Sequence, residues 1–466
     1  MTTSFILNSG RFGAVDPGLT LLQSATLWLD MATPGGDSQK VANSGTGGTA
    51  LDARLCSTTS VDTNDPLLLT HTGTNYLYLP GITGNNASAP DSAALSITGD
   101  IDIMCRVAPS DWTPAVTALL AGKWSSSAAT QAYALFLETT GVLRWVEYSG
   151  AAYNDQSSTV ATGFTDGATK WVRTTYNSAT GDTKFYTAAD ESGIPSAWTQ
   201  LGTTVAGTAR AIQDTTNALT IGESTTAGSN LLTGSVYRVA IKNGYDGAGT
   251  TVFDANFSTN TNQSSFTESS SNAATVTINR ATSGRKSVMV TRAVMLFGTD
   301  DYLEVADNAL LDFGASESFS VVYVGRQWGT SANYGTRVSK HAGGVSVGYA
   351  LLGDQTLSNL FVAIGDGVVQ TYRDGASQAF TLGALHQETM VRDVGLDTLR
   401  GWVGTTGGTA VTDATTASLA NALALNVGRN PSGTAYYNDM EVIAVAVFRS
   451  ALDSTQIGQI ATYYGV

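Results

Sequence analysis

One serine of this chain lies between glycines in a pattern that serine hydrolases use. Gly344, Ser346 and Gly348 match G-x-S-x-G, in which a strand precedes the serine and a helix follows it. Here a strand-like run, GYALL, follows instead. We therefore predict that this segment is a turn without a nucleophile.

Other catalytic groupings are also missing. The three histidines share no spacing that would bring two onto one metal or place one beside a nucleophile; they are His71, His341 and His386. Glycoside hydrolases need two carboxylates that face one cleft, about 5 Å apart in the retaining class. The run GDIDIM offers only Asp100 and Asp102. The sequence therefore predicts no enzyme and no catalytic residue, with an unrecognised glycan-processing site as the alternative.

Aromatic side chains in turn-rich segments could stack on sugar rings. A glycan-binding surface needs such rings to be exposed in loops, whereas Trp and Tyr on half-buried strands are core residues with one polar edge in water. Both interpretations remain open for each residue. The candidates for carbohydrate binding are Trp112, Trp124, Tyr153, Trp328, Tyr334 and Tyr436.

Two short acidic clusters could bind a metal ion. One supplies Asp62, Asn64 and Asp65, and the other supplies Asp300 and Asp301. Oxygen ligands of this kind suit Ca²⁺. The alternative is that Asp and Asn form turns, whose geometry they favour. Calcium is the only cofactor that the sequence suggests.

Composition excludes several classes of partner. The chain has 466 residues and a net charge of −14, whereas nucleic-acid binding needs clustered Lys and Arg. No apolar run approaches the ~18 residues of a membrane span, and the N-terminus lacks a secretory signal. We therefore expect no nucleic acid, no membrane insertion and synthesis in a cytoplasm. Charged residues make up only 13%, and a surface rich in Thr, Ser, Gly and Ala favours packing in an assembly, including a homo-oligomer.

Apolar residues alternate with polar ones in short segments throughout the chain. Examples are NYLYLPG, QAYALFLETT and SVYRVAIK, and clusters of Gly, Ser, Asn and Asp separate such segments. This pattern predicts an all-β protein built from sandwiches or jelly rolls. The convincing helix is C-terminal, where Asp453 and Gln456 form a capping-box pattern and Gly465 ends the helix.

The second half of the chain repeats the order of the first. Gly222 precedes Val236 by fourteen residues, and Gly428 precedes Val442 by the same number, 206 positions later. Other landmarks recur in the same order, among them AGKW with VSKH and KWVRTTY with TMVRDVG. Matched landmarks at similar offsets indicate a duplicated unit. The predicted parts are an N-terminal docking segment 1–26, a first jelly roll 27–244, a linker 245–252 and a second jelly roll 253–466.

These motifs resemble a known family. The order YLEV, ESFSVVYVGR, GYALL and LNVG, followed by VIAVAVF and ALDSTQI, is similar to laminin-G-like, concanavalin-type jelly rolls. The resemblance covers about 27–243 and 253–466 and implies two tandem β-sandwiches with a short C-terminal helix. Such folds serve as lectins, adhesion modules, glucanases and virion parts, so the resemblance specifies fold more closely than function.

The whole arrangement is similar to minor tail proteins of phages that infect actinobacteria. This resemblance implies a structural component of a virion, made in the host cytoplasm, whose partners are other virion proteins and host-surface carbohydrate. Two similar domains in one polypeptide would also let a weak ligand be engaged twice. The alternatives are a free-standing adhesin or lectin and a glycan-processing enzyme.

Overall fold

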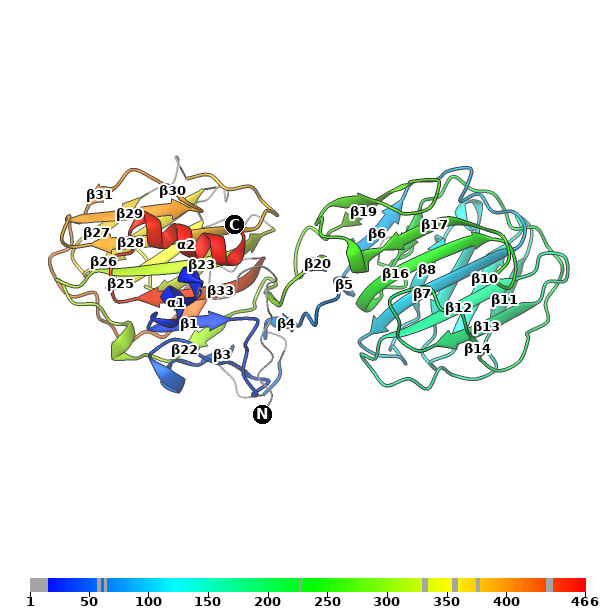
Figure 1. Ribbon diagram of the computed structural model, residues 1–466, viewed down its shortest axis with the longest axis horizontal. Coiled ribbons are helices and arrows are strands. Elements are labelled where there is room, and N and C mark those ends of the chain that lie inside the picture. The colour runs from blue at the N-terminus through cyan, green and yellow to red at the C-terminus, as the bar shows by residue number, and fades with distance from the viewer. Residues whose placement is uncertain are drawn as a thin grey trace. The chain divides into compact units, whose positions relative to one another are not determined.

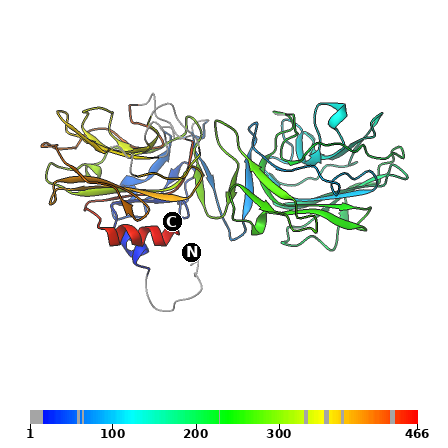
Figure 2. The ribbon, with the colours of Figure 1, turned by 90° about the horizontal axis from the view of Figure 1, so that it is seen from above.

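The computed structural model describes residues 16–56, 60–62, 65–226, 228–328, 334–353, 359–373, 378–432 and 439–466. Within these residues the protein is almost entirely β, and it divides into two compact units. Unit 1 contains the residues before Leu69 and those from Val294 onward, and unit 2 contains Leu69–Ala293. Each unit has two antiparallel sheets, which Figure 2 shows as layers of strands, and an apolar core of its own. The predicted all-β fold with two β-sandwiches is confirmed.

Unit 1 consists of a nine-stranded and an eight-stranded sheet among the described residues. The nine-stranded sheet has the order β30 (Thr406–Gly407), β29 (Thr398–Val403), β28 (His386–Asp393), β23 (Phe319–Gln327), β33 (Met440–Phe448), β21 (Val294–Leu296), β4 (Leu67–Leu69), with β1 (Leu27–Asp30) on β33 and β31 (Val411–Thr412) on β29. The eight-stranded sheet has the order β2 (Lys40–Val41), β3 (Ala53–Leu55), β22 (Leu303–Val305), β32 (Leu425–Val427), β24 (Thr336–Lys340), β25 (Gly348–Gly353), β26 (Leu360–Gly365), β27 (Gln370–Arg373).

Unit 2 has the same arrangement with two eight-stranded sheets among the described residues. One has the order β14 (Thr199–Gln200), β13 (Thr183–Ala188), β12 (Lys170–Tyr176), β7 (Ile101–Pro109), β16 (Thr233–Asn243), β5 (Tyr76–Pro80), β20 (Val288–Val290), with β17 (Thr250–Asn256) on β16. The other has the order β11 (Tyr153–Ser157), β10 (Leu143–Tyr148), β9 (Tyr133–Leu137), β8 (Ala118–Lys123), β15 (Leu219–Ile221), β6 (Asn86–Ala89), β19 (Thr275–Asn279), β18 (Ser265–Thr267). Short 3-10 turns lie at η1 (Gly48–Leu51), η2 (Ala128–Thr130), η3 (Phe257–Thr259) and η4 (Ala309–Leu311).

The predicted domain boundaries differ from those of the structure. β1 pairs with β33 of the second repeat, and β17 pairs with β16 of the first repeat, so each unit draws strands from both repeats. In Figure 1 the blue β1 accordingly lies beside β33, and β17 lies beside β16. Residues 245–252 are also not a linker between domains, because β17 begins within them and continues the sheet of unit 2.

Two helices cover the outer face of the nine-stranded sheet of unit 1 (Figure 2). The C-terminal helix α2 (Ser454–Tyr464) has the predicted capping box at Asp453, and Gly465 ends it in the left-handed conformation. A second helix, α1 (Pro17–Gln23), is capped by Asp16 and packs on α2. The part of the predicted docking segment that the structure describes is therefore a folded element of unit 1. No helix among the described residues is long and apolar enough to cross a membrane.

The repeated glycine of the sequence motif has a structural cause in both units. Gly428 has φ +91° and Gly222 has φ +89°, a region that other residues rarely adopt. A Cβ atom at Gly428 would also lie 2.7 Å from the Phe297 ring, and one at Gly222 would lie 2.2 Å from Leu79. The motif therefore marks a tight turn after β32 and after β15.

We expect Gly428→Ala to lower the free energy of unfolding of unit 1 by about 1–2 kcal/mol from the backbone conformation, with the contact on Phe297 adding to this. Calorimetric unfolding checks the value. Gly36→Ala, where no atom lies within 4 Å of the added Cβ and φ is not in the left-handed region, is the matched control. Equal stability of the two variants would contradict the prediction.

Candidate functional site

A hollow of about 440 Å³ lies on the outer face of the eight-stranded sheet of unit 1. Successive strand residues point to opposite faces, and Tyr349, Leu351 and Val362 point into the core. Their neighbours therefore point outward, and we call the space that they border the unit 1 hollow. It is lined by Tyr334, His341, Gly343, Gly344, Leu352, Phe361, Ala363, Gln370, Tyr372 and Asn430.

Three aromatic rings line the unit 1 hollow side by side. The ring centroids of Tyr334 and Phe361 lie 4.8 Å apart, and those of Phe361 and Tyr372 lie 5.6 Å apart with an interplanar angle of 18°. Tyr372 is 55% exposed, so one ring is open to solvent. Ala363 pairs with Tyr372 across the strands, and its small side chain leaves space beside the ring. The rings thus form an apolar wall that a ligand can reach.

His341 adds a polar group to the unit 1 hollow. Its side chain is buried, and its Nδ1 accepts a hydrogen bond of 3.0 Å from the backbone N–H of Gly343. Burial lowers the pKa of His341, and the backbone of Ser346 and Gly344 opposes this shift only in part. The ring is therefore neutral at pH 7, with its proton on Nε2. This Nε2 is buried and makes no hydrogen bond within the described part of the chain, so His341 lines the hollow without presenting an exposed donor.

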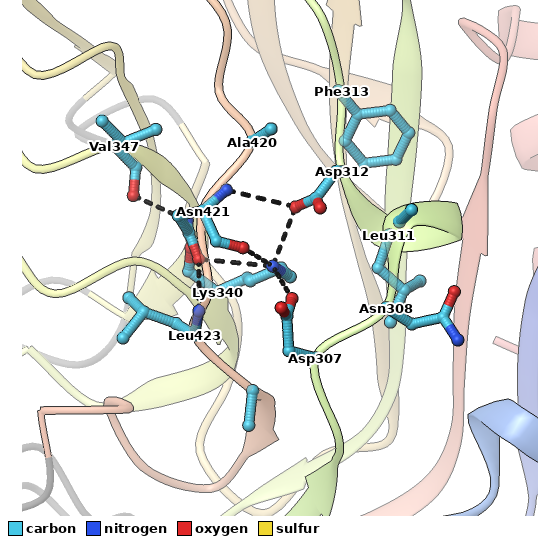
Figure 3. Close-up of polar contacts among 12 residues, drawn as sticks. Asp307, Asn308, Leu311, Asp312, Phe313, Lys340, Val347, Ala420, Asn421 and Leu423 are labelled. Carbon is cyan, nitrogen blue, oxygen red and sulfur yellow. Dashed lines mark hydrogen bonds and ion pairs between the residues drawn. The ribbon is translucent and has the colours of Figure 1, made fainter.

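A buried lysine fixes the loop that carries His341 (Figure 3). The Lys340 ammonium donates to Asp307 and Asp312 at 2.8 Å each and to the backbone carbonyl of Asn421 at 2.7 Å. The Asn421 amide in turn donates to the carbonyls of Lys340 (3.0 Å) and Val347 (2.8 Å). The Asn421 side chain thereby holds both ends of the loop between β24 and β25. This loop contains the predicted turn with Ser346, and two of its glycines line the hollow.

Unit 2 has an equivalent buried lysine but lacks the aromatic wall of the unit 1 hollow. Lys123 is also buried and donates to Asp91 at 2.6 Å and to the Thr215 carbonyl at 2.7 Å. The next residue is Trp124 in place of His341, and it packs against Phe136 with ring centroids 6.1 Å apart. A second difference appears when the strand pairs of the two units are compared. Val146 of unit 2 then takes the position that Ala363 has in unit 1. Larger side chains therefore fill this face of unit 2.

The predicted aromatic residues fall into four different environments. Tyr334 lines the unit 1 hollow, and Trp124 and Tyr153 lie together on unit 2 with ring centroids 6.2 Å apart. Trp328 donates its indole N–H to Glu441 at 2.6 Å, an arrangement that serves packing of unit 1. Trp112 is only 1% exposed within the core of unit 2, so its prediction as a sugar-binding residue is wrong. Tyr436 lies outside the described residues.

The sequence reasoning missed most of the residues that form the unit 1 hollow, namely His341, Phe361, Gln370, Tyr372 and Asn430. The strand around Phe361 reads LFVAIG, which is apolar at every position and predicts burial on both faces. The sequence does carry a signal in the next strand, where Gln370 and Tyr372 lie two positions apart and therefore on the same face. An aromatic and an amide at this period on an edge strand indicate an exposed polar face.

The predicted metal ligands are only partly brought together. Asp62 and Asp65 lie near Cys56, with one potential ligand atom of each within 4.8 Å of the others, and Asn64 lies outside the described residues. The buried Asp301 carboxylate accepts the backbone N–H of Gly298 at 2.7 Å and thereby stabilises a turn. A cysteine sulfur is not a ligand that Ca²⁺ prefers. Calcium binding therefore stays a prediction.

No protein-family model and no curated protein matches the chain. Solved structures match at low similarity. They include domains LG4-5 of the mouse laminin alpha1 chain, with 12% identity over 84% of this chain and 97% of that chain and a TM-score of 0.28. A putative carbohydrate binding protein from Bacteroides ovatus shares 10% identity over 46% and 59% of the two chains, with a TM-score of 0.32. A heptameric SAP-like pentraxin from Limulus polyphemus shares 12% identity over 38% and 80%, with a TM-score of 0.27. At these values the likeness carries no argument about function.

Proposed function

We propose that the protein is a carbohydrate-binding protein and that the unit 1 hollow binds an uncharged sugar residue. The observation that carries this proposal is the row of three aromatic rings, with Tyr372 exposed, in one hollow that Gln370 and Asn430 also line. Pyranose rings have an apolar face of C–H groups and a rim of hydroxyl groups. The hollow presents partners for both, since concave sites combine aromatic walls with a few placed polar groups.

The residues of the hollow would divide the work between stacking and hydrogen bonding. Tyr372 offers an exposed ring against which the C–H face of a sugar can pack, and the buried Phe361 stacks on this ring. The side-chain amides of Gln370 and Asn430, which line the hollow, can both donate to and accept from hydroxyl groups. A sugar residue would therefore be held on its apolar and its polar sides together.

The lining favours an uncharged ligand over an acidic one. Among the described residues that line the hollow, none carries a charged side chain at neutral pH. Burying the carboxylate of an acidic sugar here would leave that charge without a partner, which is unfavourable. The net charge of −14 would also oppose the approach of anionic glycans.

Two substitutions test the proposal. We expect Tyr372→Ala and Phe361→Ala each to weaken binding of a neutral glycan by about tenfold, equivalent to about 1.4 kcal/mol, because the first removes the exposed stacking surface and the second removes the ring that supports it. A glycan array identifies the ligand, and calorimetric titration of the full chain measures the affinity.

Val368→Ala is the matched control. Val368 is 80% exposed in the turn between β26 and β27 and does not line the hollow, so we expect unchanged affinity. If both aromatic variants bind as tightly as the original chain, the site is elsewhere. Preferred binding of acidic glycans would overturn the proposed ligand class.

We further propose, from the sequence resemblance alone, that this binding serves a tail component of a phage particle. The support is the similarity of the whole chain arrangement to minor tail proteins. Mass spectrometry of purified particles tests this location, and it can fail while carbohydrate binding by the hollow holds.

A further inference from the structure

The two sequence repeats exchange their first segments within this chain. We name residues 16–69 the first segment, with β1 to β4, and residues 250–290 the second segment, with β17 to β20. The first segment completes unit 1, whose other strands belong to the second repeat, and the second segment completes unit 2, whose other strands belong to the first repeat.

The two segments occupy equivalent positions in their sheets. Leu27 pairs with Val447 and Phe253 pairs with Ile241, and these partners are 206 positions apart, like the glycines of the motif. Both segments then add two strands at the edge of the second sheet, β3 beside β22 and β19 beside β6. Each repeat therefore accepts a segment at the same position of its sheets.

The chain crosses between the units at two short connections. β4 ends at Leu69 and β5 begins at Tyr76, yet β5 pairs with β20 of the second repeat. β20 ends at Val290 and β21 begins at Val294, and β21 neighbours β4. In a chain whose repeats folded separately, each of these neighbouring strand pairs would be a hairpin. The observed pairing is the open form of both hairpins, which is the geometry of segment exchange.

We propose that the same exchange occurs between two copies of this chain, with the first segment of one copy completing unit 1 of the other. The first segment supplies seven buried residues to the core of unit 1, so the acceptor cannot close without a copy of it; they are Leu27, Leu29, Met31, Val41, Leu51, Ala53 and Leu55. A segment from a second copy makes identical contacts, so the exchange loses none of them. Residues 70–75 connect the first segment to β5 of unit 2, whereas the second segment lies between β16 of unit 2 and β21 of unit 1. Moving the second segment to another copy would therefore displace two connections to folded strands, so we assign the exchange to the first segment.

Refolding at different protein concentrations tests the proposal on the unmodified chain. Leaving unit 1 requires its core to open, so dimers should form when the chain refolds from urea at high concentration and should persist after dilution. Light scattering measures the mass of a 48.3 kDa monomer against that of a dimer. A chain that refolds only as a monomer at every concentration overturns the proposal.

A disulfide between two paired strands shows whether the dimer is an exchanged one. Asp30 and Ala444 are direct partners across β1 and β33, at a spacing that suits a disulfide. In an Asp30→Cys, Ala444→Cys variant refolded reduced and then oxidised, we expect the disulfide to link two chains in the dimer fraction and to stay within one chain in the monomer fraction.

A Met104→Cys, Ala240→Cys variant is the matched control, because β7 and β16 both belong to the first repeat and would stay in one chain. A dimer in which neither variant links the chains is a surface association, and one in which both do is an unspecific exchange. Either result overturns the proposal.

Discussion

Replacing Lys340 with methionine will lower the free energy of unfolding of unit 1 by about 3 kcal/mol, because it removes the cation from a group of buried oxygens. The ammonium is fully buried and lies between Asp307 and Asp312, whose charges would then face each other. Both aspartates are partly exposed, which keeps the effect at the lower end of what breaking a buried ion pair causes. Differential scanning calorimetry measures this, with one transition expected for each of the two cores.

Lys123→Met is the matched variant in unit 2, where one aspartate contacts the ammonium. We expect it to lower the unit 2 transition and to leave the unit 1 transition in place, the reverse of Lys340→Met. If both variants lower both transitions equally, the units do not unfold separately. If neither transition moves, the buried lysine does not stabilise the loop beside the hollow.

Glu147→Gln will stabilise unit 2 at pH 8 by about 2–3 kcal/mol and will have little effect at pH 4.5. Burial raises the pKa of Glu147 to about 7, although Arg210, Asn154 and Tyr176 oppose the shift. The unfolded chain releases this proton near pH 4.5. Between these values the folded state binds more protons, so the free energy of unfolding falls as pH rises from about 4.5 to about 7. Glutamine stays neutral and removes this loss.

Urea unfolding between pH 4.5 and pH 8 checks this pH dependence. Glu191→Gln, at an exposed position of the same unit, makes the same chemical change and should leave the slope unaltered. The matched strand pairs place Ile364 at the equivalent position of unit 1, so the unit 1 transition should not respond to Glu147→Gln. An unchanged slope in the Glu147 variant would show that this carboxyl does not hold its proton above its ordinary pKa.

The repeat could be detected from the sequence, but its exchange could not. Spacing such as that of Gly222 to Val236 follows from local turns and strand lengths, and the structure confirms it as a turn followed by a strand in both units. Whether β1 pairs with Val239 or with Val445 is a different question, because both partners are valines in equivalent strands. Because the chain contains two similar acceptors, the connections between the strands decide which of them β1 joins. The sequence of these connections has no pattern that predicts the outcome. Helix α1 did have a local signal, since Asp16 and Pro17 form a helix start.

The hollow was harder to predict than the sheets that form it. Trp112 lies beside turn residues in the sequence and was expected to be exposed, yet its indole N–H donates to the Ala168 carbonyl within the core of unit 2. Tyr372 lies on a strand, and it was not predicted because the prediction covered only aromatic residues in turn-rich segments. Which face of a strand has space for a ligand depends on neighbouring strands, as Ala363 and Val146 show, and a single sequence does not specify those neighbours.

The crossed connections also determine what happens when the backbone is cut. A protease that cleaves in 244–249 cuts the junction between the two repeats, yet neither product is a whole sandwich. Each fragment contributes paired strands to both sandwiches. We therefore expect sheet hydrogen bonds and the two apolar cores to hold the two fragments together after cleavage. A cut at the junction between the two sequence repeats thus leaves the two halves of the protein associated.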